Sequence, residues 1–302
     1  MMKKLLNTIV CLLLCISGTT LSAQTIAKDC PLVAKTQVVE GGTIHYLEGG
    51  NGPAVLLLHG LFAQKEQWIE VGCALAKQSL RVIAPDLPGY GASRPFPNSV
   101  YHLHQQVEVL QSLMDKLQIK VVHLGGSSMG GAIAALYAKR HPSQVQTLAF
   151  IGAPLGIAPW SPQIQQSLGK GINLFIPQNS AEFDLEMQLL FAKPPLIDPT
   201  IKETLIQSYR SDRSHYQMVW EIVNQYTRIL EPMRLTQPTF AVWGAQDGVF
   251  LAKGANALQQ RITNGKVQID PNSAHLLMLE DPQRVSQDYE RFIKKSGRTK
   301  NL

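Results

Sequence analysis

Short apolar runs alternate with longer amphipathic stretches along the first half of the chain. The runs have the length of strands buried on both faces of a sheet, and they occupy residues 54–58, 81–84, 121–124 and 148–151. The intervening stretches have helical spacing or are rich in Ala, and they cover residues 66–78, 101–117 and 132–139. Alternating runs around Gly41-Gly42 predict an N-terminal hairpin, with strands at residues 36–39 and 43–47. This order predicts an α/β fold, with a mostly parallel sheet and helices on both faces.

The alternation stops near residue 154 and resumes near residue 233. Only helical pieces punctuated by Pro lie between these points, at residues 182–191, 201–209 and 216–230. Strands then return at residues 239–243 and 267–269, with helices at residues 252–260 and 282–294. We therefore predict a core built from residues 24–153 and 233–302, with an inserted helical cap at residues 154–232.

Residues 1–23 have the pattern of a secretory signal peptide. Lys3 and Lys4 precede an apolar run, and Ala23 supplies a small residue at the expected cleavage edge. The apolar run spans residues 5–16, whereas a membrane-spanning helix needs about 20 apolar residues, so cleavage is favoured over an anchor. We expect a protein that is exported across the inner membrane and is periplasmic or extracellular.

Charge and cysteine content narrow the possible partners. The 302-residue chain has a formal net charge of +6, two units of which leave with the signal peptide. No dense Lys/Arg run occurs outside the two ends, so we expect no nucleic-acid partner.

Cys30 and Cys73 remain after cleavage and can pair in an oxidising compartment, but we favour unpaired cysteines, with Cys73 buried on a helix and Cys30 in a loose arm. No Cys/His spacing typical of a metal site occurs, and we expect no metal and no cofactor.

The sharpest local feature is the sequence Gly126-Ser127-Ser128-Met129-Gly130, which lies between a predicted strand and a predicted helix. In that setting G-x-S-x-G predicts a nucleophile elbow, a tight turn that exposes a serine hydroxyl. The residues two before and two after the nucleophile must be small, which favours Ser128 over Ser127. The N–H of Met129, at a helix N-terminus, is a candidate donor to an oxyanion.

A serine nucleophile needs a general base, which follows it in the chain order expected for this elbow. His275 lies in the loop after the last predicted strand, at the carboxyl edge of the sheet where sites in open α/β folds gather. His141 ends a helix and His215 lies in the helical block, so His275 is the preferred base.

The base needs an acid that orients it. Asp247 follows the predicted strand at residues 239–243 and lies at the same edge as His275. The rival, Asp270, stands only five residues before His275 and is better placed to serve a turn with Pro271. We therefore predict Asp247 as the acid.

Two further loops flank the predicted site. The loop His59-Gly60-Leu61-Phe62 follows the strand at residues 54–58, and the Leu61 N–H is our choice for a second oxyanion donor, with Phe62 next. His59 precedes the serine in the chain and is interpreted as a brace for this loop. Residues 86–93 match no dinucleotide or phosphate-binding motif and are interpreted as a structural turn beside the site.

Together these motifs resemble those of the α/β-hydrolase superfamily over nearly all of the mature chain. They are His59-Gly60, Asp86-x-x-Gly89-x-Gly91-x-Ser93, Gly126-x-Ser128-x-Gly130, Gly244-x-x-Asp247 and His275. Within the superfamily, the chain resembles bacterial lipases and esterases and monoacylglycerol-lipase-like members. The resemblance implies Ser128 as nucleophile, His275 as base, Asp247 as its partner and residues 154–232 as the cap. Haloalkane dehalogenases and epoxide hydrolases carry Asp at the nucleophile position, which Ser128 excludes.

We expect an enzyme that cleaves carboxylic esters through an acyl-enzyme, acting on small-molecule or lipid esters with an apolar acyl chain. A transient contact with a membrane surface is compatible with such a substrate. One alternative is a C–C bond hydrolase of the meta-cleavage type, which shares Ser-Met-Gly-Gly but is cytosolic. Another is a non-catalytic ligand-binding module on the same scaffold, against which the complete set of Ser128, Asp247 and His275 counts.

Overall fold

The fold is a single twisted sheet with helices on both faces. The computed structural model describes residues 29–298, so the predicted signal peptide lies outside the described residues. Eight strands are ordered β1-β2-β4-β3-β5-β6-β7-β8, and only the pairings of β2 with β1 and with β4 are antiparallel. The predicted α/β fold with a mostly parallel sheet is confirmed. The strands are β1 (Val33–Val39), β2 (Gly42–Gly49), β3 (Ala54–Leu58), β4 (Arg81–Pro85), β5 (Val122–Ser128), β6 (Val145–Pro154), β7 (Leu235–Gly244) and β8 (Ile262–Asp270).

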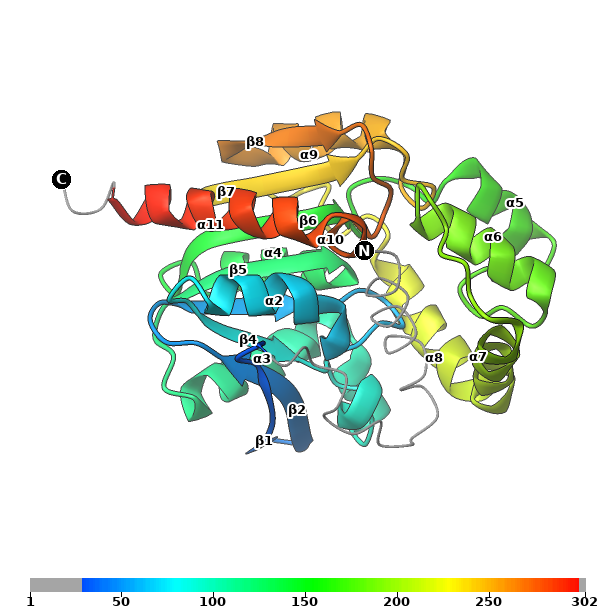
Figure 1. Cartoon of the computed structure of the whole chain (residues 1–302), viewed down its shortest axis with the longest axis horizontal. Coiled ribbons are helices and arrows are strands. Elements are labelled where there is room, and N and C mark those ends of the chain that lie inside the picture. Colours follow the sequence, from blue (N-terminus) through cyan, green and yellow to red (C-terminus); the bar gives the residue numbers. More distant parts are fainter. Residues whose placement is uncertain (1–28, 299–302) are drawn as a thin grey trace.

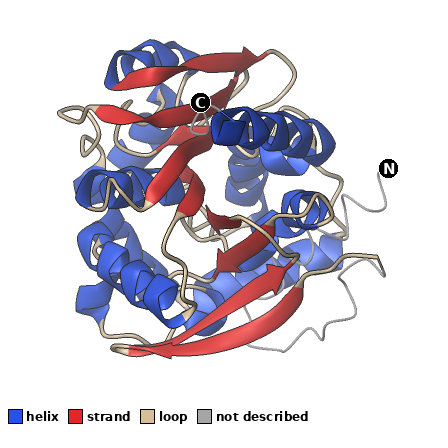
Figure 2. Cartoon of the chain, turned by 90° about the vertical axis from the view of Figure 1, so that its left-hand side faces the viewer, coloured by secondary structure: helices blue, strands red, loops and turns tan. Residues whose placement is uncertain are grey.

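Helices cover the two faces of the sheet, as Figures 1 and 2 show. Helices α2 and α11 pack together on one face, and α3 and α4 pack together on the other. A short α10 precedes α11, and single 3-10 turns connect several elements. The bounds are η3 (Lys65–Trp68), α2 (Ile69–Ala76), η4 (Gly91–Ser93), η5 (Asn98–Tyr101), α3 (Leu103–Lys116), α4 (Met129–Arg140), η7 (Ala252–Gly254), α9 (Ala255–Arg261), α10 (Leu277–Glu280) and α11 (Pro282–Arg298).

The apolar runs of the sequence become strands because both sides of the sheet are covered. All five residues of β3 are buried, and they alternate between two hydrophobic clusters. Val55 and Leu57 pack with α2 and α11, whereas Leu56 and Leu58 pack with α3 and α4. The edge strand β8 is mostly exposed, so its apolar pattern is weak, and it is longer than the predicted residues 267–269.

Four helices and one 3-10 turn lie between β6 and β7 and form what we call the helical block. In Figure 1 they stand at one end of the sheet, beyond the carboxyl ends of the parallel strands. They lie within the residues predicted as a cap, although the predicted helix over residues 216–230 ends earlier, at Val223. The elements are α5 (Pro162–Gly169), α6 (Ser180–Leu190), α7 (Pro199–Ser211), α8 (Arg213–Val223) and η6 (Asn224–Tyr226).

The starts of three of these helices follow from their capping residues. The side chains of Ser161, Asn179 and Asp198 each accept a hydrogen bond from a backbone N–H in the first turn of α5, α6 and α7. Pro162 and Pro199 stand at the first helical position, where a missing N–H costs no intrahelical bond. Local sequence therefore divides the block into separate helices.

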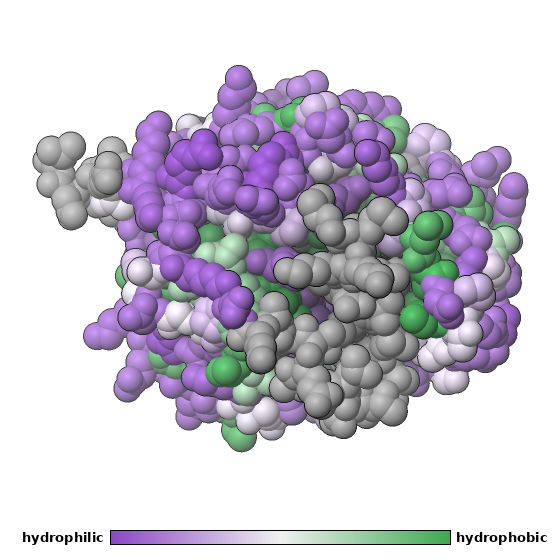
Figure 3. All heavy atoms as spheres, viewed as in Figure 1, coloured by the Kyte–Doolittle hydropathy of each residue, from purple (hydrophilic) through white to green (hydrophobic). Residues whose placement is uncertain are grey.

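The surface facing the viewer in Figure 3 is mostly hydrophilic, with hydrophobic atoms gathered over the helical block. In the segment between α6 and α7, the side chain of Leu196 is 83% exposed. Among the described residues, no helix is both long enough and apolar enough to cross a membrane.

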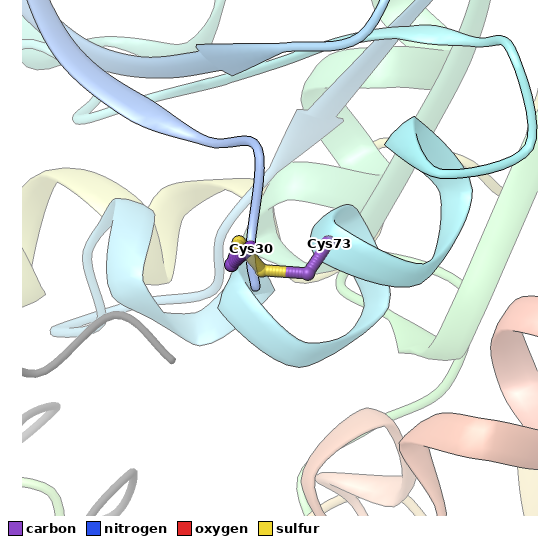
Figure 4. Close-up of a disulfide and its surroundings, with 2 residues drawn as sticks. All are labelled: Cys30 and Cys73. Atoms are coloured by element: carbon purple, nitrogen blue, oxygen red, sulfur yellow. A yellow bond between two sulfur atoms is a disulfide. The ribbon is translucent and has the colours of Figure 1, made fainter. Parts of the chain in front are cut away.

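A disulfide joins Cys30, which precedes β1, to Cys73 on α2, as Figure 4 shows. Their Cα atoms are 5.1 Å apart, and Leu32 packs against Gly72 at the same place. The favoured expectation of two unpaired cysteines was therefore wrong. Leu32 holds the N-terminal arm against α2. The spacing of the two cysteines in the sequence does not reveal that the arm follows this path.

Reduction of this disulfide is expected to lower the free energy of unfolding by about 3 to 4 kcal/mol, because the bond closes a loop of 43 residue positions in the unfolded chain. Urea unfolding with and without reductant measures the effect. The double variant Cys30→Ser/Cys73→Ser is the control and should match the reduced protein. Equal unfolding midpoints for the oxidised and reduced protein would contradict this expectation.

Candidate active site

Ser128 stands in a strained turn between β5 and α4. Its backbone has φ 52° and ψ −119°, in the left-handed region that side-chain-bearing residues avoid. A Cβ on Gly126 would lie 2.3 Å from the backbone of Gly130, and one on Gly130 would lie 2.2 Å from the carbonyl oxygen of Leu58. Glycine is therefore required at both positions. The structure shows the tight turn that the sequence predicts, with Ser128 as the strained residue.

His275 and Asp247 form a buried hydrogen-bonded pair. Asp247 follows β7, His275 follows β8, and Nδ1 of His275 lies 2.9 Å from Oδ2 of Asp247. The other carboxylate oxygen accepts the N–H groups of Val249 and Phe250, at 2.8 and 2.9 Å. Because Nδ1 must carry a hydrogen to donate to the carboxylate, Nε2 of a neutral His275 ring is free to accept a proton.

Two glycines allow the His275 loop to approach the strand ends. A Cβ on Gly244 would lie 2.1 Å from the carbonyl oxygen of Ala274, so β7 contacts this loop directly. A Cβ on Gly152 would lie 2.8 Å from the carbonyl oxygen of His275 and 3.3 Å from Oγ of Ser127. Gly152, near the end of β6, therefore stands between the loop of His275 and the turn that holds Ser127 and Ser128.

The loop after β3 passes beside Ser128. A Cβ on Gly60 would lie 3.4 Å from Cβ of Ser128. The N–H of Ala63 bonds to the carbonyl of Gly60, and Phe62 has φ 56°, so residues 60–63 form a tight turn. Among the described residues, the N–H groups of Leu61 and Phe62 have no hydrogen-bond acceptor. Met129 is the first residue of α4, and its N–H is one of the donors that a helix leaves without an intrahelical acceptor.

His59 has the bracing role expected of it. The ring is fully buried, Nδ1 donates to the carbonyl of Gly60 at 2.8 Å, and Nε2 accepts the N–H of Leu87 at 3.0 Å. Burial lowers the pKa of His59 to about 4, so the ring is neutral at physiological pH. With both nitrogens engaged, His59 links the loop after β3 to the loop after β4.

Asp86 organises the turn at residues 86–93, as the sequence analysis expects. Its carboxylate accepts the backbone N–H and the ammonium of Lys65, both at 2.8 Å, and the N–H of Ala92 at 3.0 Å. A Cβ on Gly91 would come within 2.5 Å of this carboxylate. Asp86 thus fixes the conformation of the turn that lies beside the site.

Two of the rejected candidates, Asp270 and His215, have structural partners elsewhere. Asp270 bonds to Ser273 and Arg284 in the turn after β8. His215 on α8 donates from Nε2 to the carbonyl of Gly89 at 2.9 Å, where the helical block meets the core. Among the described residues, no group of three or more His, Cys, Asp or Glu side chains could hold a metal ion.

Sequence reasoning missed two buried polar residues, one that bonds to the loop after β3 and one in the helical block. Gln67, on η3, accepts a hydrogen bond from the N–H of Gly60. Glu186, on the buried face of α6, has a carboxylate oxygen with no hydrogen-bond partner among the described residues. A glutamate within the apolar stretch of residues 183–191 was a signal for Glu186, whereas nothing in the sequence marked Gln67.

Burial raises the pKa of Glu186 to about 8. The folded protein therefore holds a proton that the unfolded chain releases near pH 4.3, and the free energy of unfolding falls as pH rises from about 4 to about 8. We expect Glu186→Gln to abolish this fall, so that the variant gains about 2 kcal/mol or more over the parent between pH 5 and pH 8.

Urea unfolding at the two pH values measures this gain. Glu221→Gln, at an exposed position on α8, is the control for the substitution itself. A difference between Glu186→Gln and the parent that does not change with pH would contradict the raised pKa of Glu186.

Known proteins resemble this chain in fold and in sequence. Residues 53–195 match the model of the alpha/beta hydrolase fold family. A monoacylglycerol lipase of Mus musculus is 30% identical over 271 residues, which cover 83% of this chain and 79% of the relative. A solved bacterial membrane phospholipase A has a TM-score of 0.81 and 30% identity, with 88% and 87% of the two chains covered. A solved putative lipase of Acinetobacter baumannii has a TM-score of 0.74 and 26% identity, with 89% and 93% covered. The chain belongs to the α/β-hydrolase family.

Proposed function

We propose that this protein is a serine hydrolase that cleaves carboxylic esters of the lipase and esterase type. The observation that carries the proposal is the strained Ser128 at the end of β5, with the buried His275–Asp247 pair formed between the loops after β7 and β8. The names of the relatives, a monoacylglycerol lipase, a phospholipase and a putative lipase, support ester bonds as the substrate class.

In the proposed reaction, Oγ of Ser128 attacks the ester carbonyl while Nε2 of His275 takes the hydroxyl proton. Asp247 holds the ring through Nδ1 and stabilises the imidazolium that forms. The N–H groups of Leu61 and Met129 bind the oxyanion, each contributing roughly 3 to 4 kcal/mol to stabilisation of the transition state. His275 then gives the proton to the leaving alcohol, and water cleaves the acyl-enzyme by the same steps in reverse.

The aromatic side chains beside His275 favour an apolar acyl chain. The Phe250 ring lies 5.8 Å from the His275 ring and 4.8 Å from Trp160, centroid to centroid. Trp160 stacks in turn on Trp220 of α8 at 5.3 Å, and Phe175 lies 5.5 Å from Trp220. An aromatic cluster thus runs from His275 into the helical block. Other large apolar residues of the block, such as Phe183, pack into the core.

Ser128→Ala is expected to lower kcat/KM for p-nitrophenyl esters at least about 10³-fold, because no other hydroxyl occupies the turn position. A chain-length series of these esters measures the effect and gives the acyl preference. Ser127→Ala is the matched control and should stay within a few-fold of the parent, since Oγ of Ser127 is buried without a hydrogen-bond partner among the described residues.

Full ester hydrolysis by Ser128→Ala would contradict the proposed nucleophile. A dienoate substrate in the same assay distinguishes the C–C hydrolase, which would turn it over faster than any ester. Failure to cleave either substrate, with no reaction of Ser128 with a phosphonate, would indicate a binding module.

Asp247→Asn is expected to lower kcat about 10³- to 10⁴-fold with little change in KM, because an amide can hold the histidine in the wrong tautomer. Steady-state kinetics on the preferred ester measures both parameters. Asp270→Asn is the control: it disturbs the contact with Arg284 but should leave kcat within a few-fold. Comparable losses of kcat in the two variants would contradict the assignment of Asp247 as the acid that orients His275.

A further inference from the structure

The N–H of Gly60 is held by a buried side chain from another element. Oε1 of Gln67, on η3, accepts this N–H at 2.9 Å, and the Gln67 side chain is almost completely buried. An N–H used in this way cannot donate to an oxyanion. The donors that remain in residues 60–63 are those of Leu61 and Phe62, because the N–H of Ala63 bonds to the Gly60 carbonyl.

The peptide that carries the Leu61 N–H is fixed through its carbonyl. The carbonyl of Gly60 accepts Nδ1 of His59 at 2.8 Å and the N–H of Ala63 at 3.2 Å. A peptide group is planar, so a fixed Gly60 carbonyl fixes the direction of the Leu61 N–H. The preceding peptide is fixed by Gln67. Together these bonds restrain both peptides around Gly60, the residue whose backbone would otherwise have the most freedom.

The other end of the Gln67 amide contacts the element that follows His275. Nε2 of Gln67 donates to Sδ of Met278 at 3.4 Å, and Met278 lies on α10, three residues after His275. The orientation of the amide follows from this arrangement, because a flipped amide would set two N–H donors of Gln67 and Gly60 against each other. A single side chain thus joins the loop beside Ser128 to the segment of the general base.

We propose that Gln67 is a positioning residue for the oxyanion: it holds Gly60 so that the Leu61 N–H points at the developing negative charge and keeps this loop in register with the segment of His275. This inference rests on the proposed function. Gln67 itself does not touch the substrate, and it lies outside every motif that the sequence analysis identified. A purely structural role would predict the same hydrogen bonds but no selective effect on the transition state.

The test compares three variants at this position. Gln67→Met keeps the shape but loses the oxygen acceptor, Gln67→Asn is too short to reach Gly60, and Gln67→Glu retains an oxygen acceptor. We expect kcat to fall about 10- to 100-fold in the Met and Asn variants, less than the loss from deleting a donor outright, with KM within about threefold. Gln67→Glu keeps the acceptor for Gly60 but loses the amide donor to Met278, so its kcat should lie between those of the parent and Gln67→Asn. Comparison of kcat between the Asn and Glu variants tests the proposal even if the Met variant does not fold.

A second readout separates positioning from general destabilisation. An alkylboronic acid forms a tetrahedral, anionic adduct on the serine, whereas a long-chain alcohol binds without one. Inhibition by the boronic acid should weaken in parallel with kcat/KM in the Met and Asn variants, while inhibition by the alcohol stays unchanged. Thermal unfolding of the same variants tests whether each one is folded at the assay temperature.

The proposal is overturned if the Met and Asn variants keep kcat/KM within twofold of the parent, or if both inhibitors weaken equally. Ser128→Ala in the same assay reports separately on the proposed function. If Ser128→Ala retains activity, the nucleophile is wrong; if it is inactive and the Gln67 variants behave as the parent, only the positioning role is wrong.

Discussion

The candidate active site depends on the close approach of β5, α4 and β3 at the turn of Ser128. Glycines at positions 126 and 130 let the strand, the helix and the carbonyl of Leu58 come within distances that no Cβ permits. This packing holds Ser128 at a positive φ, a conformation that would relax if the surroundings were looser. The strain is therefore maintained by the packed sheet, whose strands β3 and β5 are wholly buried.

The same constraint recurs wherever a loop converges on this point. Gly60 brings the loop after β3 beside Ser128, and Gly152 and Gly244 admit the loop of His275. Parallel strands direct these loops to one edge of the sheet, and the glycines let the loops close on one another. Buried polar side chains then fix the loops: His59 and Gln67 for the first, Asp247 for the second. The sheet thus brings these loops to one edge, and side-chain hydrogen bonds fix the conformations of the loops.

The elbow and its partners could be predicted because each sits where a strand ends, and strand ends are visible as the limits of apolar runs. The choice of Ser128 rested on the G-x-S-x-G spacing and that of Asp247 and His275 on this placement and the chain order. The disulfide could not be predicted, since it depends on the path of the arm before β1. Gln67 escaped notice for a similar reason: its partners, Gly60 and Met278, are 7 and 211 positions away, and no local pattern relates them. Most of β8 was not predicted, because this exposed edge strand has only a weak apolar pattern.

We propose that Ser128 carries the acyl group during ester cleavage. An aryl carbamate tests this proposal, because a serine that attacks the carbamate carbonyl expels the phenol and keeps a carbamoyl group that water removes slowly. Incubation with the carbamate, followed by peptide mass spectrometry, locates the group while residual ester hydrolysis is followed in parallel. We expect one carbamoyl group on Ser128 and a loss of activity in proportion to its occupancy. Loss of activity with the group on any other residue would contradict it.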